Sequence, residues 1–325
     1  MTDKTKGQST LRAAGFELRI ARNRRTHEFR RVPVIDSHVH LYPSGLNRDP
    51  SGWAAVRGET HWALLSLRQR KNGRPVQAFP EVSGLLRAMD EAGIVRAVLL
   101  GWYWQRAESC AEQNRFYAEC VRLHPDRLSA FAALQPAAGR EPALAELRRA
   151  RDEGLAGLGE LSPHSQGYAV DDPVFREVLA LAAELKLPVN LHVTDPEGWD
   201  YPGRVMTPLT DFIGLANQFP HATFILAHWG GLLPMDRGST KLPANIYYDT
   251  AASPLLYGPE IWRNFIREAG PDHVLFGSDF PLNLYPRLES EPEIARLVRE
   301  AQLSGISADS LAAVFYENAK RVLRL

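Results

Sequence analysis

The sequence is poor in cysteine and has no excess of charge of either sign. Its 325 residues include two cysteines, Cys110 and Cys120, which fall in one helix-like stretch and too far apart along it to bridge easily. This argues against a disulfide-stapled secreted scaffold, and we expect a reducing, cytoplasmic setting. Lys and Arg total 38, as do Asp and Glu, so the chain lacks the positive field of general nucleic-acid or membrane-surface binders. We expect a small-molecule partner.

Long hydrophobic runs are also missing from the N-terminal region. Residues 1–31 are rich in Arg and Lys, so we expect neither a secretory signal nor a transmembrane helix there. The composition of this basic segment allows three interpretations: a transit peptide, a nucleic-acid arm or a solvated extension outside the folded domain. We favour the solvated extension. We therefore divide the chain into a basic N-terminal extension, 1–31, and one domain, 32–325.

A pair of histidines ends the first apolar run, Val-Ile-Asp-Ser-His-Val-His, at residues 34–40. Residues i and i+2 of a strand face the same side, so Asp36, His38 and His40 would project into one space. Two neighbouring imidazoles make half of a site for zinc, iron, nickel or copper. Histidine pairs also occur at strand ends without a metal, so this prediction depends on the rest of the chain.

Three further apolar runs end in residues with ligand or acid–base chemistry. Residues 188–192 end at His192, residues 222–228 at His228, and residues 273–279 at Asp279. Each run has the length and composition of a buried parallel strand. Catalytic residues of eight-stranded βα barrels come from the C-terminal ends of several strands, so this pattern predicts that the four run ends form one site.

Apolar runs and amphipathic helix candidates alternate along the chain from residue 81. The strand candidates cover 32–40, 94–101, 128–134, 155–161, 188–193, 222–228, 245–250 and 273–279, and the helix candidates cover 81–92, 107–124, 140–153, 171–186, 207–219, 257–269 and 289–302. This alternation predicts an α/β fold, a (β/α)8 TIM barrel. An open doubly wound sheet usually carries a Gly-x-Gly-x-x-Gly turn after its first strand, and this chain has none there.

Two segments fall outside this alternation. Residues 41–80 lack clear periodicity, which predicts a long loop after the first strand, and loops of this length are usually functional or mobile. The segment from Ser307, a helix N-cap candidate, to Leu325 predicts one or two closing helices.

Taken in order, these motifs resemble those of the amidohydrolase superfamily, in the branch that contains metal-dependent hydrolases and aromatic-acid or aminocarboxymuconate-type decarboxylases. The resemblance extends from Ile35 to Leu323, and its carriers are Asp36-Ser-His38-Val-His40, Leu191-His192, Ala227-His228-Trp-Gly-Gly231 and Gly277-Ser-Asp279-Phe-Pro281. It implies a divalent metal held by His38, His40, His192 and Asp279, and an acid–base or polarising role for His228. It also implies, weakly, a homodimer.

One position departs from the pattern of many superfamily members. They place a carboxylated lysine at the end of strand four to bridge two metals, whereas this chain has Glu160. Glu160 would either ligate or bridge metal, or hydrogen-bond a ligand histidine. The absence of the lysine favours one metal ion, with zinc as the first expectation and manganese or iron as alternatives.

Such a metal site supports more than one reaction. Our first prediction is hydrolysis of a C–N or C–O bond in a small cyclic or aromatic substrate, with Asp279 as the proton carrier and His228 as an electrostatic partner. The alternative is a non-oxidative decarboxylase or hydratase on the same ligands, which would want arginines facing the metal. A degenerate barrel that only binds is the third possibility, disfavoured by the intact ligand set.

Substrate-contact candidates lie in the segments that follow the predicted strands. We name Trp53, Arg57, Trp102, His164 and Arg204, because arginines suit an acidic substrate and aromatic rings suit a flat one. Arg106, Arg237, Tyr103, Trp104 and Trp199 are eligible on the same grounds. An arginine in a loop is more often exposed to solvent than in contact with substrate. An aromatic residue at the base of a loop serves equally often to pack the protein interior, so these assignments rest on position alone.

Overall fold

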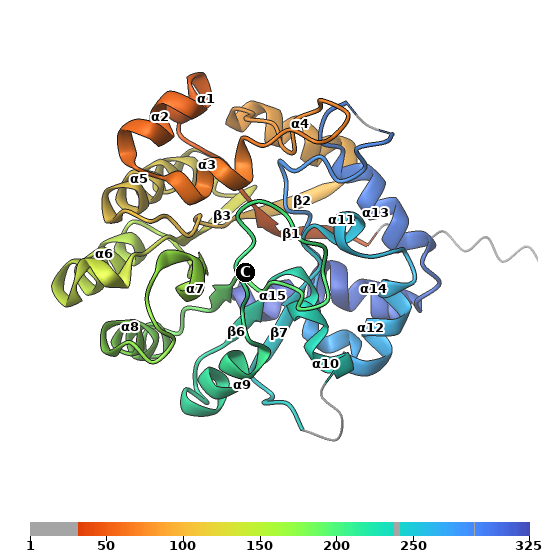
Figure 1. Ribbon diagram of the computed structural model, residues 1–325. Helices are drawn as coiled ribbons and strands as arrows, with labels where there is room; N and C mark the ends of the chain where they lie inside the picture. Colours follow the sequence, from red (N-terminus) through yellow and green to blue (C-terminus); the bar gives the residue numbers. More distant parts are fainter. Residues whose placement is uncertain (1–31, 237–240, 289) are drawn as a thin grey trace, which may run out of the picture. The chain divides into compact units, whose positions relative to one another are not determined.

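The computed structural model describes residues 32–236, 241–288 and 290–325, and the basic extension predicted at 1–31 lies outside them. Eight parallel strands form one sheet in the order β1 to β8, and helices surround them (Figure 1). The strands are β1 (Val34–Val39), β2 (Ile94–Leu99), β3 (Leu128–Ala132), β4 (Gly157–Leu161), β5 (Val189–Leu191), β6 (Phe224–Leu226), β7 (Ile246–Asp249) and β8 (Val274–Leu275).

Backbone hydrogen bonds join the first strand to the last and close the barrel. The amide of Ser37 donates to the carbonyl of Phe276 at 2.8 Å, and the amide of Asp279 donates to the carbonyl of His38 at 2.9 Å. The predicted (β/α)8 TIM barrel is thus confirmed. No helix in the described part of the chain combines the length and the apolar character needed to cross a membrane.

The helices between strands follow the predicted alternation. The longer ones are α4 (Val82–Ala92), α5 (Ala107–Leu123), α6 (Arg140–Asp152), α8 (Pro173–Glu184), α9 (Leu209–Gln218), α12 (Ile261–Ala269) and α13 (Ile294–Leu303). The shorter ones are α7 (Pro163–Gln166), α10 (Leu233–Asp236), α11 (Ser253–Leu256), α14 (Ala308–Ala312) and α15 (Asn318–Leu323), with the turns η1 (Pro136–Ala138), η2 (His228–Leu232), η3 (Pro271–His273) and η4 (Ala313–Glu317). Cys110 and Cys120 are both buried and unpaired in α5.

The prediction of a continuous loop at 41–80 is wrong in its first part. This segment forms three short helices, α1 (Ser44–Arg48), α2 (Pro50–Arg57) and α3 (Thr60–Ser66). They are too short to show a period, and an aromatic cluster that includes the buried Trp62 and the half-buried Trp53 packs them onto the barrel. One local signal was available: the Asp49 side chain accepts from the Gly52 amide at the start of α2, and Pro50 is the first helical residue.

The C-terminal helix packs against the barrel interior. Ala319, Val322 and Leu323 of α15 share a buried cluster with Ile35, Val98, Phe131, Ile225 and Leu275 from five strands. A larger apolar cluster joins the strands to the surrounding helices. The predicted closing helices are therefore present, and apolar packing fixes the strands whose ends carry the candidate ligands.

Close approaches of the backbone make two glycines necessary beside those ligands. A Cβ atom on Gly277 would meet the Cβ of His38 at 2.8 Å, and one on Gly159 would meet the carbonyl oxygen of Asn190 at 2.3 Å. Gly159 also has φ of +121°, which side-chain-bearing residues rarely adopt. These glycines let β1, β4, β5 and the segment after β8 approach closely.

Candidate active site

The predicted ligands come together at one end of the barrel, although they lie on strands far apart in sequence. His38 lies in β1 and His40 directly after it, and their Nε2 atoms are 3.1 Å apart. His192 follows β5, and its Nδ1 is 3.2 Å from Nε2 of His228, which follows β6. Asp279 follows β8, and its Oδ1 lies 3.5 Å from His40 Nε2.

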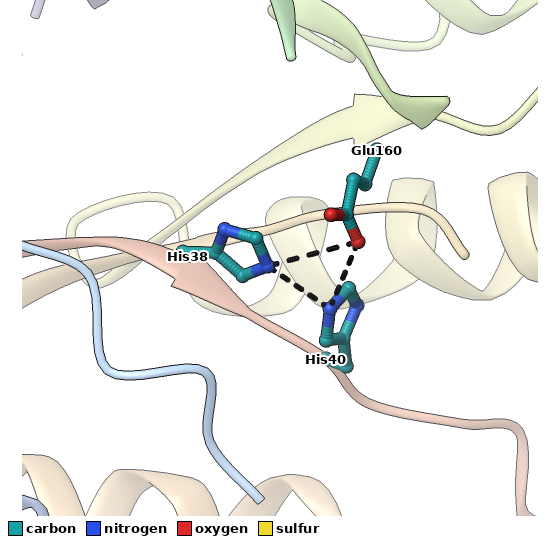
Figure 2. Close-up of side chains that lie close together, drawn as sticks. All are labelled: His38, His40 and Glu160. Atoms are coloured by element: carbon teal, nitrogen blue, oxygen red, sulfur yellow. Dashed lines mark hydrogen bonds and ion pairs between the residues drawn. The ribbon is translucent and has the colours of Figure 1, made fainter. Parts of the chain in front are cut away.

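Glu160, from β4, lies between the two histidine pairs. Its Oε2 is 3.8 Å from His38 Nε2 and 3.6 Å from His40 Nε2; Figure 2 shows both rings directed at this carboxylate. Its Oε1 is 2.9 Å from His192 Nδ1 and 3.6 Å from His228 Nε2. Each pair forms a group with Glu160 whose ligand atoms are close enough to hold one ion. The arrangement therefore allows one ion, or two bridged by this carboxylate.

The outer hydrogen bonds of His38 and His40 make their inner nitrogens suitable for a metal. His38 Nδ1–H donates to Asp249 Oδ2 at 2.9 Å, and His40 Nδ1–H donates to the carbonyl of Leu100 at 3.0 Å. With both protons held outside, the two Nε2 lone pairs of the neutral rings face each other across 3.1 Å. Such lone pairs repel unless a cation or a proton lies between them. The residues present therefore fit a divalent metal ion.

Asp249 ends β7 and organises the back of the site. Besides His38, its carboxylate accepts from the Asn190 side chain at 3.0 Å and from the backbone amides of His228 at 3.2 Å and Ala251 at 3.0 Å. It is fully buried. We did not name Asp249 from the sequence, although the run Ile-Tyr-Tyr-Asp carries the same signal as the others, an apolar run that ends in a carboxylate.

The electrostatics of the metal-free site centre on His38. Burial by itself lowers the pKa of this imidazole, but the carboxylates of Asp249, Asp279 and Glu160 raise it to about 10. Burial lowers the pKa of His40, and the neighbouring His38 lowers it further. The three carboxylates thus favour a proton on His38.

The pKa values of Glu160 and His228 are shifted in opposite directions from their ordinary values. Burial acts to raise the pKa of Glu160, but the charge and hydrogen bond of His192, with help from His228 and His38, hold it well below its usual range. Burial acts to lower the pKa of His228, but Glu160 and Asp279 raise it. The site therefore keeps Glu160 ionised and favours a positive charge on His228.

Asp36 does not join these groups, contrary to the expectation that it would share one space with the histidines. Its Oδ1 accepts from the Ser278 amide at 2.9 Å, and its Oδ2 from the Ser278 hydroxyl at 2.5 Å. Burial raises its pKa to about 7. The pairing of β1 with β2 changes register between Asp36 and Val39, so the simple alternation of faces breaks down there. Asp36 instead ties β1 to the residue before Asp279.

His228 and Asp279 both have backbone conformations that are uncommon for residues with a side chain. Their φ angles are +57° and +65°, in the left-handed region that L-residues rarely occupy. The surroundings hold them there: the His228 amide donates to Asp249 and the Asp279 amide to the carbonyl of His38. Strained backbone of this kind is concentrated at functional sites.

A cavity of about 220 Å³ opens beside the candidate ligands. Trp102 and Tyr103 stack in its wall with ring centroids 4.5 Å apart. The Trp102 ring lies 5.2 Å from that of His40, and the Tyr103 ring lies 4.9 Å from that of His192. Aromatic rings therefore lie beside the candidate ligands in the wall of this cavity.

The structure brings some of the named substrate candidates to this cavity and leaves others outside. Trp102 and Arg204 are in its wall. Trp53, Arg57 and His164 are not among the lining residues: Trp53 packs against Trp62 and Trp104, Arg57 pairs with Glu112, and His164 pairs with Asp211. Their substrate roles remain predictions, and none of the three side chains lines the cavity. Arg237 lies outside the described residues.

Two arginines that the sequence reasoning passed over line the cavity. They are Arg68 and Arg70, on the segment after α3. Their position in a long segment without periodicity concealed them, and only the folding of that segment over the barrel brings them to the site. Tyr201, which also lines the cavity, lies under Arg68 with 4.7 Å from the guanidinium carbon to the ring centroid.

Comparisons with known proteins agree with this architecture. The 6-methylsalicylic acid decarboxylase of Penicillium expansum is 26% identical over 294 residues, which cover 76% of this chain and 84% of that protein. The uncharacterized metal-dependent hydrolase YabD of Bacillus subtilis is 25% identical over 205 residues, which cover 54% of this chain and 72% of that protein.

A solved structure has the same fold. The dihydroxybenzoic acid decarboxylase of Polaromonas sp. JS666, with bound manganese and the inhibitor 2-nitroresorcinol, aligns with a TM-score of 0.63 and 20% identity over 90% of this chain and 97% of that one. A family model described as amidohydrolase matches residues 35–325. The chain belongs to this amidohydrolase family.

Proposed function

We propose that the protein is a metal-dependent, non-oxidative decarboxylase of a hydroxylated aromatic acid. The observation that carries the proposal is the stacked pair Trp102 and Tyr103, whose rings adjoin the imidazoles of His40 and His192. A planar substrate lying on this wall would present its substituents directly to the candidate ligands. The decarboxylase relative that aligns over three-quarters of the chain supports this reaction.

The ligand set that we propose is His38, His40, Glu160, His192 and Asp279. A divalent ion held there would supply a Lewis acid that binds a carboxylate or phenolic oxygen and stabilises negative charge on it. The manganese in the structurally similar decarboxylase makes manganese a candidate beside zinc. One ion per chain remains our prediction, with two bridged by Glu160 as the alternative occupancy.

Asp279 is the proposed acid. In its protonated form it gives its proton to the ring carbon that bears the carboxylate, the bond between that carbon and the carboxylate breaks, and carbon dioxide leaves. The proton is then replaced from solvent, so the net reaction consumes one proton and needs no redox cofactor. His228 Nδ1 donates to the carbonyl of Ala251 at 3.2 Å and lies 3.8 Å from Asp279 Oδ2, so a protonated His228 would place positive charge beside the reacting end.

The hydrolase predicted first from the sequence uses the same residues, so the ligands do not choose between the two reactions. The metal-dependent hydrolase relative supports that alternative over a smaller part of the chain. In a hydrolase, Asp279 would accept a proton from water instead of delivering one to carbon. Decarboxylation needs an acidic aromatic substrate, and the aromatic wall and cavity arginines suit such a substrate better than a neutral ester or lactam.

Incubation of the purified protein with manganese or zinc and a panel of hydroxybenzoic acids should release carbon dioxide and the corresponding phenol. Asp279→Asn should lower kcat at least about a hundredfold, because proton transfer typically contributes that much, while the affinity for a non-reacting benzoate changes less. The measurement is product formation by chromatography, with esters and lactams tested in parallel. Hydrolysis of these and no decarboxylation would refute the proposal.

Glu160→Gln should change the number of metal ions bound, because the substitution removes a charged oxygen from both candidate groups. His192→Ala should remove metal and nearly all activity while the barrel stays folded. Metal per chain is measured by atomic emission after loading and desalting, and folding by circular dichroism. Unchanged stoichiometry and affinity in Glu160→Gln would show that this residue only supports His192.

Asp249→Asn should weaken metal binding about ten- to a hundredfold, because the acceptor that fixes the His38 tautomer loses its charge. Affinity is measured by competition with a chromophoric chelator. Asp211→Asn is the matched control, since it removes a carboxylate from the His164 pair outside the cavity and should leave metal affinity unchanged. Equal effects of the two substitutions would contradict the role given to Asp249.

Metal binding should release close to one proton per chain at pH 7. The pKa of His38 in the metal-free site is raised to about 10, so below that pH the metal must displace a proton, and affinity should rise as pH increases. Calorimetric titrations in buffers of different ionisation enthalpy give the number of protons released. Affinity independent of pH between 6 and 9 would show that His38 is not protonated in the metal-free protein.

A further inference from the structure

The cavity is lined by groups of opposite charge. The carboxylates of Glu160 and Asp279 lie among the histidines, whereas Arg68 and Arg70 contribute positive charge to the wall. Tyr201 is within electrostatic reach of both sets: burial raises its pKa, Arg68 lowers it, and Glu160 and Asp279 raise it. A substrate in this cavity therefore meets both the candidate metal ligands and cationic side chains.

Arg68 and Arg70 lack an acidic partner within the described chain. Arg68 stacks on Tyr201 and forms no ion pair there, and Arg70 donates from Nη2 to the carbonyl of Asn283 at 2.9 Å. The Nε atoms of both arginines are buried and have no hydrogen-bond partner among these residues. Burial and, for Arg70, the neighbouring Arg68 lower their pKa values. Two adjacent, partly desolvated cations without a counter-ion are unfavourable, and an anion would relieve that cost.

The segment that carries these arginines is held firmly. Gln69 pairs with Pro75 in an antiparallel bridge, and Gln77 pairs with Leu282, so the hairpin is attached to the segment just after Asp279. The Ala78 amide adds a hydrogen bond to the carbonyl of Pro281 at 3.0 Å. The guanidinium groups thus lie on an ordered hairpin, so less conformational entropy is lost when a ligand binds to them.

The other cavity arginine has different partners. Arg204 donates from Nη2 to the carbonyl oxygens of Asp195 at 2.9 Å and Pro196 at 3.1 Å, which fixes the segment between β5 and α9. Its hydrogen bonds hold the protein's own backbone. Arg204 Nε is also buried without a hydrogen-bond partner among the described residues, but Arg204 makes two hydrogen bonds to the segment that carries it. Arg68 and Arg70 differ in being neighbouring cations, and this paired positive charge suits a ligand anion best.

We propose that Arg68 and Arg70 form a subsite for a second anionic group of the substrate, a carboxylate, on the part of the molecule away from the candidate metal ligands. The inference rests on the proposed function for the first group, which the metal end would hold. The substrate class is then an aromatic acid that carries two acidic groups. Arginine suits this role because its planar fork donates two parallel hydrogen bonds to a carboxylate.

The test compares non-reacting probes by calorimetry on the metal-loaded full chain. Benzoate carries one carboxylate, whereas isophthalate and terephthalate carry a second at two different spacings. At least one dicarboxylate should bind about tenfold more tightly than benzoate, as expected for one added charge-assisted contact, and the preference should decrease at high salt. Equal binding of all three probes would overturn the subsite.

Substitutions test which residues cause the preference for dicarboxylates over benzoate. The Arg68→Gln, Arg70→Gln double variant should lose the dicarboxylate preference and bind benzoate as the wild type does. Arg68→Lys, which keeps the charge, should retain part of the preference. The matched control is Arg127→Gln, because Arg127 is not among the residues that line the cavity and pairs with Asp90, and it should keep the full preference. An equal loss of benzoate and dicarboxylate binding in the double variant would count against a separate subsite.

The probes do not react, so the result is independent of turnover. A dicarboxylate preference that depends on these arginines, in a protein that decarboxylates nothing, would support the subsite and refute the proposed function. Decarboxylation of monocarboxylic acids, with no dicarboxylate preference, would leave the proposed function intact and overturn the subsite alone. The two claims therefore fail separately.

Discussion

The burial of charged groups at one end of the barrel is the constraint on which the rest of the structure depends. Glu160, Asp249 and Asp279 are buried together with His38, His40 and His228, and His192 beside them is partly exposed. Buried charges are tolerated only when they are paired or bind a cation. The hydrogen bonds behind the site, above all those of Asp249, hold the histidines in place. In the proposed site, a divalent ion would offset part of this negative charge.

In the barrel, different parts of the strands provide stability and carry the polar site. Apolar side chains inside the strands and between strands and helices provide stability without polar contacts. The ends of β1, β4, β5, β6, β7 and β8 are then free to carry ligands and their hydrogen-bond partners. The aromatic wall belongs to the segment after β2, and the arginine hairpin to the segment after β1. The candidate ligands and the cavity wall therefore belong to different segments of one barrel.

Local pattern predicts the barrel and the gathering of four strand ends at one site, whereas the ligand set is implied by the family resemblance. Short apolar runs that end in His192, His228 and Asp279 show the strands and their functional ends together. The cavity wall could not be predicted in this way: Arg57 and Arg68 lie in the same segment, yet the first pairs with Glu112 and the second reaches the cavity. That difference depends on tertiary packing of short helices. Asp249 could have been found, since it lies next to the end of the predicted strand 245–250.

The hydrogen bonds between Asp36 and Ser278 join residues 242 positions apart in the chain. The same junction brings His38 and His40 to Asp279, so a chain that lacks its last strand cannot assemble the full ligand set. During synthesis, His38 and His40 precede Asp279 by nearly the whole domain, so their contact with Asp279 forms only after the last strand has been made. Contacts of such long range make folding slower. If the proposed ligand set binds metal, that binding would depend on contacts formed late in the folding of the domain.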